Sequence, residues 1–244
     1  MTKDNLQASL DTLPAWRPSG SVMSFQYRHP DWFSQHIPDW ERLLAEFVAK
    51  PKLRFLEVGS FEGRSAVWML QNVLTDPSSS LVCVDTFQGG DDMASLDLTG
   101  LRQTFIDNVA PFGRRVRLIT EHSGTALRTL RGPFDFVYVD ASHIAEDVLE
   151  DAVLAWRLLR TGGIMAFDDY IWRGPPDPRL CPRAGIDAFL ATRRPDSFEL
   201  THKWVQLFVR KLGHEEGRVV PDTRPTFWLW LKRFFHSRTA RLDR

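Results

Sequence analysis

Five short apolar runs divide this sequence, and longer stretches with helical spacing of apolar residues lie between them. The runs span residues 53–58, 81–84, 116–119, 134–139 and 164–167. Short continuous apolar runs are typical of strands that are buried on both faces. A helix between two strands returns the chain to the same end of the sheet, so successive strands run parallel. The pattern therefore predicts an α/β fold with a doubly wound, mostly parallel sheet.

The helical stretch between the fourth and fifth runs is the clearest. Its apolar residues recur on one face across residues 144–159, and Glu146 and Asp147 suit the first turn of a helix. We expect the pair Gly162-Gly163 to end this helix. The other elements predicted from the pattern are a helix within residues 31–50, a short helix after Gly185 and a closing antiparallel hairpin within residues 197–211.

The composition is that of a globular protein with balanced charge. Thirty-one basic residues match thirty-one acidic ones, and apolar residues make up 43% of the chain. Without net positive charge, extensive binding to nucleic acid is not expected. Two cysteines, Cys83 and Cys181, predict neither a disulfide framework nor a zinc site, which favours a reducing cytoplasm. Residues 1–10 lack the apolar stretch of a signal peptide, and no apolar run approaches the roughly 20 residues of a membrane span.

Changes in composition divide the chain into three segments. Residues 1–22 read as a flexible lead-in, 23–212 as one α/β domain and 213–244 as an aromatic and basic tail. Within the tail, residues 224–244 combine tryptophan and phenylalanine with arginine and lysine. Such a helix can lie in a membrane interface, form an oligomer contact or pack on its own domain, and the sequence leaves all three open. We therefore expect a cytoplasmic protein, with peripheral membrane contact as one role for the tail.

Carboxylates mark the ends of four of the apolar runs. Glu57 lies near the end of the first, Asp85 and Asp140 follow the second and fourth, and Asp168 and Asp169 follow the fifth. In a parallel sheet these ends share one edge, where ligands bind in open α/β folds. Helix capping would account for one or two of these residues but not for the set. The spacing therefore predicts a ligand site at this edge.

The loop after the first run indicates the kind of ligand. Gly59 and Gly63 allow a tight turn between strand and helix. Phe61 and Arg64 occupy the second and third glycine positions of the dinucleotide fingerprint, which disfavours an NAD-dependent oxidoreductase. Glu62 at the helix start would repel a pyrophosphate. A zwitterion, such as the methionyl part of S-adenosylmethionine (SAM), suits the loop better.

Each end of SAM then has a predicted partner. Its ammonium would meet Glu57, and its carboxylate would meet the helix N-terminus and the Ser65 hydroxyl. Asp85 stands where a carboxylate accepts hydrogen bonds from two ribose hydroxyls.

Three segments resemble the class I SAM-dependent methyltransferases, especially the metal-dependent branch that acts on catechols and macrolide sugars. EVGSFEGRSAV at 57–67 is similar to their motif I, VDTF at 84–87 to motif II, and residues 136–170 to the later motifs. The resemblance covers roughly residues 30–211. It implies a Rossmann-like seven-stranded sheet with a C-terminal antiparallel hairpin, and a methyltransferase domain over 23–212. It assigns cofactor binding to Glu57, Gly59, Ser60, Phe61, Gly63, Ser65, Asp85, Thr86, Ser123 and Asp140.

The same resemblance implies a divalent cation. The matching positions are Asp140, Asp168 and Asp169, and an all-oxygen site suits Mg²⁺ or Mn²⁺. Strands that neighbour each other lie about 4.8 Å apart, so carboxylates at their ends can share one ion. His143 matches the position of the catalytic base, and a histidine titrates near neutrality. A metal-free enzyme, in which Asp168 and Asp169 only order the following loop, is the alternative.

The predicted function is methyl transfer from SAM to a hydroxylated small molecule, a sugar or a phenolic natural product, with assistance from Mg²⁺. His143 and Asp140 are the predicted catalytic residues. Two alternatives remain open at this stage: a metal-independent N- or carboxyl-methyltransferase, and a SAM-binding protein without catalysis.

Overall fold

The computed structural model describes residues 24–90, 93–172 and 174–213. The predicted lead-in and residues 224–244 of the tail lie outside the described residues.

Seven strands form one sheet in the order β3-β2-β1-β4-β5-β7-β6. The pairs β1–β2, β1–β4, β2–β3 and β4–β5 are parallel, whereas β7 is antiparallel to both β5 and β6. This confirms the predicted fold class, including the C-terminal antiparallel hairpin. The strands are β1 (Arg54–Val58), β2 (Ser80–Val84), β3 (Val116–Ile119), β4 (Phe134–Val139), β5 (Leu159–Phe167), β6 (Phe198–Lys203) and β7 (Leu207–Lys211).

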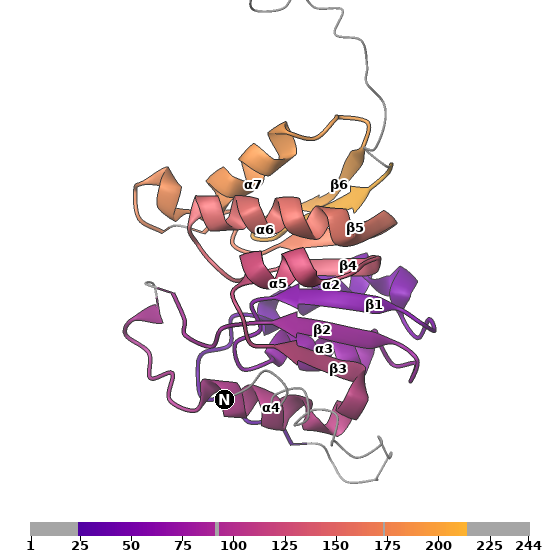
Figure 1. Cartoon of the computed structure of the whole chain (residues 1–244), viewed down its shortest axis with the longest axis vertical. Coiled ribbons are helices and arrows are strands. Elements are labelled where there is room, and N and C mark those ends of the chain that lie inside the picture. Colours follow the sequence, from indigo (N-terminus) through magenta and orange to yellow (C-terminus); the bar gives the residue numbers. More distant parts are fainter. Residues whose placement is uncertain (1–23, 91–92, 173, 214–244) are drawn as a thin grey trace, which may run out of the picture. The chain divides into compact units, whose positions relative to one another are not determined.

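Helices cover the sheet on both sides, which is why its central strands are apolar throughout. In Figure 1, α5, α6 and α7 lie in front of the strands, and α2 and α3 lie behind them. Each side has its own apolar core: Phe55, Met69 and Phe105 belong to one, and Val137, Ala152 and Phe189 to the other. The helices are α2 (Ile37–Leu43), α3 (Arg64–Asn72), α4 (Leu101–Val109), α5 (Ser123–Thr129), α6 (Ala145–Leu158) and α7 (Pro182–Ala191).

The end of α6 differs from the prediction. Gly162 and Gly163 do not end the helix but lie inside β5, which begins at Leu159. The buried Lys211 of β7 donates from Nζ to the carbonyl oxygens of Trp156 and Leu159, at 2.8 and 2.9 Å. A cation on the last carbonyls of a helix stabilises its end. The carbonyls at the end of α6 are therefore bonded by Lys211, which is distant in the sequence, and the glycine pair does not end the helix.

Two further boundaries differ from expectation. The predicted helix within 31–50 is α2 flanked by the 3-10 turns Ser34–His36 and Ala45–Phe47. The helix expected after Gly185 begins at Pro182, because proline is well placed in the first turn.

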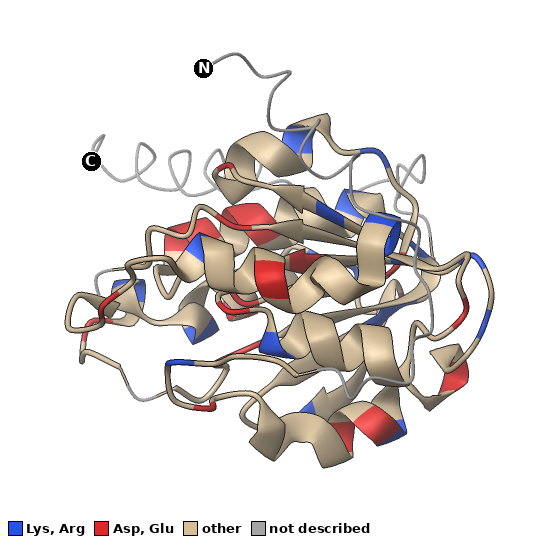
Figure 2. Ribbon diagram, turned by 90° about the horizontal axis from the view of Figure 1, so that it is seen from below, with Lys and Arg blue, Asp and Glu red and all other residues tan. Residues whose placement is uncertain are grey.

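Charged residues of both signs are spread over the described part of the chain, as the balanced composition predicts. Figure 2 shows acidic and basic positions interspersed over the helices and loops. Among the described residues, no helix has the length and apolarity that a membrane crossing requires.

Candidate functional site

The carboxyl ends of β1, β2, β4 and β5 meet at one edge of the sheet. The residue after each strand donates its backbone N–H to the last residue of a neighbouring strand: Gly59 to Val84 at 2.9 Å, Asp140 to Val58 at 2.8 Å and Asp168 to Val139 at 3.0 Å. These bonds extend the parallel ladder by one residue beyond the strands. The residues that follow the strands are therefore held in line, as the sequence predicts.

The loop between β1 and α3 passes very close to the end of β4. Gly59 has a φ of +86°, and a Cβ there would lie 1.9 Å from the carbonyl oxygen of Asp140. Only glycine tolerates both the left-handed backbone and this approach. The contact joins the predicted cofactor loop directly to the predicted metal site.

Glu57 lies beneath this loop and is completely buried. Its carboxylate accepts hydrogen bonds from the hydroxyls of Ser60 at 2.6 Å and Ser65 at 2.5 Å, and from the Cys83 thiol at 3.5 Å. Burial raises the pKa of Glu57 to about 7, although the two serine hydroxyls act in the opposite direction.

These contacts concern two predicted ligand contacts, with the SAM ammonium and carboxylate, which stay predictions. Glu57 has no exposed surface with which to meet an ammonium group. The Ser65 hydroxyl has one hydrogen, and it is directed at Glu57 rather than at a ligand carboxylate. Both residues act in the structure as internal supports of the loop.

Asp85 holds the loop from the neighbouring strand. Its Oδ2 accepts the backbone N–H groups of Ser60 at 2.7 Å and Phe61 at 2.8 Å, and its Oδ1 accepts that of Phe87 at 2.6 Å. A carboxylate offers about four acceptor positions, so these bonds leave room for a further donor. The next residue, Thr86, is half-buried and accepts a hydrogen bond from Gln88.

Glu62 faces the N-terminal segment rather than a ligand. It is 3% exposed, and it accepts the backbone N–H groups of Arg28 and His29 and contacts the His29 ring at 3.0 Å. Asn108 of α4 donates to the carbonyls of both Gln26 and Glu62, each at 2.8 Å. Residues 24–34 are thereby fastened along the cofactor loop.

An aromatic pair completes this contact. The ring of Trp32 lies 5.5 Å from that of Phe61, a loop residue with a φ of +48°. A large side chain in this region of backbone space is uncommon and occurs at functional sites.

Ser123, the predicted adenine-contact residue, begins α5. Its hydroxyl bonds to Asp151 of α6, which is 2% exposed. Burial, with smaller contributions from Asp147 and Glu150, raises the pKa of Asp151 to about 7, although the Ser123 hydroxyl acts in the opposite direction.

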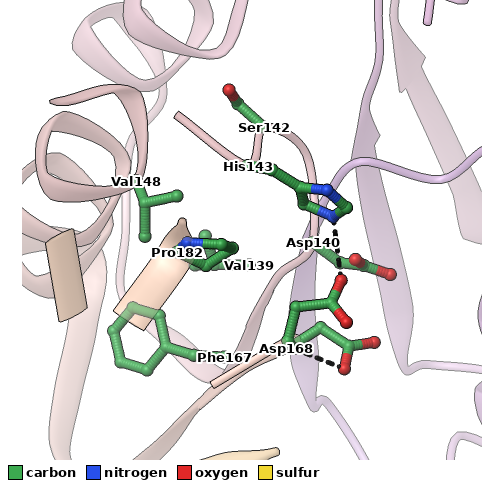
Figure 3. A pocket seen from close by; sticks show the side chains of 9 residues that line it. Val139, Asp140, Ser142, His143, Val148, Phe167, Asp168 and Pro182 are labelled. Carbon is green, nitrogen blue, oxygen red and sulfur yellow. Dashed lines mark hydrogen bonds and ion pairs between the residues drawn. The ribbon is translucent and has the colours of Figure 1, made fainter. Parts of the chain in front are cut away.

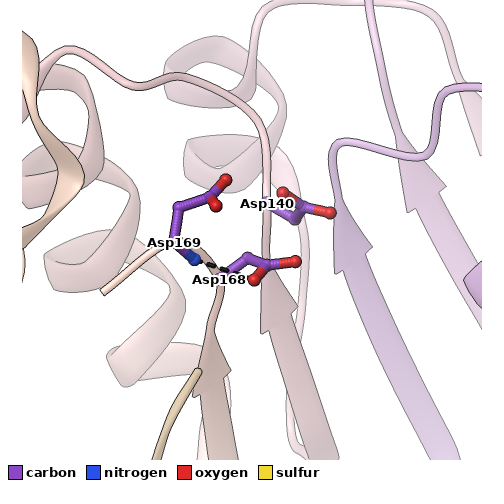
Figure 4. A group of neighbouring side chains, drawn as sticks. All are labelled: Asp140, Asp168 and Asp169. Carbon is purple, nitrogen blue, oxygen red and sulfur yellow. Dashed lines mark hydrogen bonds between the residues drawn. The ribbon is translucent and has the colours of Figure 1, made fainter. Parts of the chain in front are cut away.

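Asp140, Asp168 and Asp169 form a tight cluster at the ends of β4 and β5. One oxygen from each lies within 4.8 Å of the others, and Figure 4 shows the three carboxylates directed toward a common space. Asp140 keeps contact with solvent, whereas Asp168 and Asp169 are half-buried. The surrounding protein raises the pKa of Asp140 and of Asp168, and charge repulsion within the cluster raises both further. Three converging oxygen ligands fit a hard divalent cation.

His143 lies at the rim of this cluster. Its Nε2 is 2.9 Å from Oδ2 of Asp169, and its ring lies 4.3 Å from that of Trp172. Figure 3 shows the imidazole above the aspartates in a pocket that Val148, Phe167 and Pro182 also line. Nδ1 is buried, and Nε2 can take a proton from an acceptor only when it is not donating to Asp169. Asp169 has a φ of +56°, so the backbone is strained at this carboxylate.

Sequence reasoning missed one group at the site. Tyr138 of β4 is 1% exposed, yet its hydroxyl donates toward both Asp140 and Asp168. Burial and the two carboxylates raise the pKa of Tyr138 well above its usual value, so the hydroxyl keeps its proton at neutral pH. In the sequence this tyrosine reads as one more residue of an apolar strand. Its signal in the sequence is the two-residue spacing from Asp140, which places both side chains on the same face of the chain.

Comparison with known proteins agrees with this arrangement. A family model described as a methyltransferase domain matches residues 56–170, from β1 to the residue after Asp169. Uncharacterized protein R132 of Acanthamoeba polyphaga mimivirus is 28% identical over 135 residues, which are 52% of this chain and 56% of that protein. The chain thus spans little more than half the length of this relative.

Two solved structures show the same fold. The O-methyltransferase TomG from Streptomyces achromogenes, involved in tomaymycin synthesis and solved with SAM, is 21% identical; 72% of this chain and 80% of TomG superpose with a TM-score of 0.54. MycE from the mycinamycin biosynthetic pathway, solved with Mg, S-adenosylhomocysteine and mycinamycin VI, is 18% identical over 84% of this chain and 55% of MycE, with a TM-score of 0.50.

The family match runs from within β1 to just past β5 and so covers the strands and the loop at this edge, and the sheet continues beyond it through β7 and β6. Residues 56–170 therefore match a methyltransferase domain, and the fold is one that solved methyltransferases share.

Proposed function

We propose that the chain is a divalent-cation-assisted O-methyltransferase for a hydroxylated small molecule, a sugar or a phenolic compound. The observation that carries this proposal is the cluster of Asp140, Asp168 and Asp169, whose oxygens lie within 4.8 Å of one another beside His143. In MycE, a protein of the same fold, Mg is present together with S-adenosylhomocysteine and mycinamycin VI. Fold alone does not select an acceptor, so the argument rests on this cluster.

The methyl donor would lie along the loop between β1 and α3. Backbone groups of Gly59, Ser60, Phe61 and Gly63 would border it, and Asp85 has acceptor capacity for a ribose hydroxyl. Thr86 and Ser123 are proposed to border its ribose and adenine parts. Glu57 and Ser65 would act from below, by keeping the loop in shape. Bound SAM supplies an electrophilic methyl group to the reaction.

The three aspartates would hold Mg²⁺ or Mn²⁺, and a bound cation lowers the pKa of an acceptor hydroxyl and fixes its position. His143 would accept the hydroxyl proton at Nε2 once Asp169 turned from that nitrogen to the cation. Until then Asp169, 2.9 Å from Nε2, would orient the ring. Rate then depends mainly on alignment of the acceptor oxygen with the methyl group.

The test is calorimetric titration with SAM, with and without Mg²⁺, followed by a panel of catechol and sugar acceptors. We expect SAM binding in both conditions, and acceptor binding and release of S-adenosylhomocysteine only with Mg²⁺. Asp168→Ala should abolish both the Mg²⁺-dependent acceptor binding and the activity. Asp76→Ala, in the loop before β2 at the opposite edge, is the matched control and should behave as wild type.

Each failure has its own meaning. Turnover that withstands chelation and Asp168→Ala would point to a metal-independent enzyme with a nitrogen or carboxylate acceptor. SAM binding without S-adenosylhomocysteine release from any acceptor would favour a non-catalytic SAM-binding protein.

A further inference from the structure

A buried chain of hydrogen bonds leads from α2 to the carboxylate cluster. Trp40 of α2 donates from Nε1 to Oε1 of Gln206 at 2.7 Å. Gln206, in the turn between β6 and β7, donates from Nε2 to the Tyr138 hydroxyl at 3.4 Å. The hydroxyl lies 2.5 Å from Oδ2 of Asp168 and 2.9 Å from Oδ2 of Asp140.

Packing fixes the position of the tyrosine hydroxyl. Trp40, Gln206 and Tyr138 are 0%, 2% and 1% exposed. The Trp40 and Tyr138 rings meet edge to face with centroids 4.8 Å apart. A side chain enclosed in this way has one available rotamer, so its hydroxyl is a fixed point against which the flexible aspartates can be aligned.

The hydroxyl also joins two strands. Asp140 follows β4 and Asp168 follows β5, and each side chain could rotate independently about its own χ1. The hydroxyl has one hydrogen and two lone pairs, so it can donate to one carboxylate at a time while it accepts from Gln206. A shared donor keeps both Oδ2 atoms close to one point, which restrains the separation of the two carboxylates.

We propose that Tyr138 is a positioning residue for the cation site, and that Gln206 and Trp40 orient it. This inference rests on the proposed function, since it requires the three aspartates to bind a cation. Partners that orient metal ligands typically contribute 10- to 100-fold to metal affinity. The arrangement also makes the site depend on α2 and on the β6–β7 turn, neither of which supplies a ligand.

The test is Mn²⁺ binding to the full chain, and the bound fraction is measured from the decrease in the electron paramagnetic resonance signal of free Mn²⁺. Tyr138→Phe keeps the ring and removes only the hydroxyl. We expect it to weaken Mn²⁺ binding about 10- to 100-fold, with SAM affinity unchanged. Gln206→Met, which keeps the hydroxyl but removes its donor, should weaken Mn²⁺ binding about threefold.

Tyr170→Phe is the matched control. Tyr170 is 2% exposed and donates to Asp187 at 2.8 Å, so this variant also loses a bond from a buried tyrosine to an aspartate, but outside the cluster. It should bind Mn²⁺ as wild type does. A loss of Mn²⁺ affinity equal to that of Tyr138→Phe would show a general effect of lost buried bonds and overturn the inference.

The remaining outcomes separate this inference from the proposed function. Wild-type protein that binds no Mn²⁺ would overturn the proposed cation site, and the role of Tyr138 with it. Wild-type binding that Tyr138→Phe retains in full would overturn the role of Tyr138 alone. If Tyr138→Phe does not fold, Gln206→Met decides, and unchanged Mn²⁺ affinity in that variant would overturn the inference.

Discussion

The carboxylates of the two halves of the site have different hydrogen-bond partners. In the cofactor half, Glu57 and Asp85 each accept several hydrogen bonds from hydroxyls or backbone amides, and the charge of Asp85 adds to the raised pKa of Glu57. In the cation half, Asp140, Asp168 and Asp169 face one another and share few donors. The cofactor loop is therefore held in place by the chain itself. The aspartate cluster keeps its charges close together at an energetic cost, as an ion-binding site must.

The largest effect is expected where the two halves meet. A Cβ at Gly59 would overlap the carbonyl oxygen of Asp140, and the backbone there is left-handed. Gly59→Ala should lower the free energy of unfolding by on the order of 4 kcal/mol, from strain and overpacking together. Urea unfolding followed by circular dichroism measures this. Gly213→Ala, where the new methyl meets nothing within 4 Å, is the control and should unfold as wild type does.

The second prediction tests whether a buried carboxylate beside the cofactor half, Asp151, lowers the stability of the protein when it is ionised. The pKa of Asp151 is about 7 in the folded protein, because the residue is buried, against 3.8 as the ordinary value. The native state therefore binds more protons than the unfolded state between these pH values, and stability falls as pH rises from about 4 to about 7. Asp151→Asn should remove this slope and stabilise the protein by about 3 kcal/mol at pH 8.

The measurement is urea unfolding at pH 5 and pH 8. The gain should be smaller at pH 5, where about a third of the change between pH 4 and pH 7 has developed, and reach its full size above pH 7. Equal effects of Asp151→Asn at both pH values would contradict the prediction. They would show that the Ser123 bond matters more than the buried charge.

The third prediction concerns the cation half. Surrounding protein and the other two aspartates raise the pKa of Asp140. Asp140→Asn removes one of three like charges, so in the presence of a chelator the variant should be more stable than wild type by on the order of 1 kcal/mol at pH 8. With Mn²⁺ the order should reverse, because only wild type gains the free energy of ion binding. Thermal melts in chelator and in Mn²⁺ check both signs. A variant that is less stable under both conditions would show that Asp140 is a structural residue.

The contrast between the halves also explains which features the sequence could predict. Strands, the Gly59 turn and the acidic ends depend on local patterns, and a parallel sheet brings strand ends to one edge whatever the side chains do. The partners of Glu57 and Ser65 depend on side-chain direction, which residue spacing does not specify. Tyr138 and Gln206 lie 68 positions apart, and both read as ordinary parts of a strand and a turn. Their contact exists only because the antiparallel β7 lies next to β5.

The N-terminal segment presents the same difficulty, and the last and smallest effect is expected there. Glu62 looks like a charge that faces a ligand, but it fastens Arg28 and His29, 34 and 33 residues away. Trp32 is 47% exposed and contacts the ring of Phe61, whose backbone is strained at φ +48°. The ring contact restrains Phe61 from outside, much as Glu57 supports the loop from beneath.

Trp32→Ala removes this ring contact, while the His29 ring stays 4.9 Å from that of Phe61. Because Trp32 is half exposed, its loss should lower the free energy of unfolding by about 0.5 kcal/mol. SAM affinity should fall about threefold, since part of the binding energy would be spent on ordering Phe61. Trp204→Ala at the β6–β7 turn is the control: Trp204 is 65% exposed and does not belong to the cofactor loop. Calorimetric titration of both variants with SAM separates the two positions. Equal SAM affinity in Trp32→Ala and wild type would mean that the Trp32 ring covers the cofactor loop without shaping it.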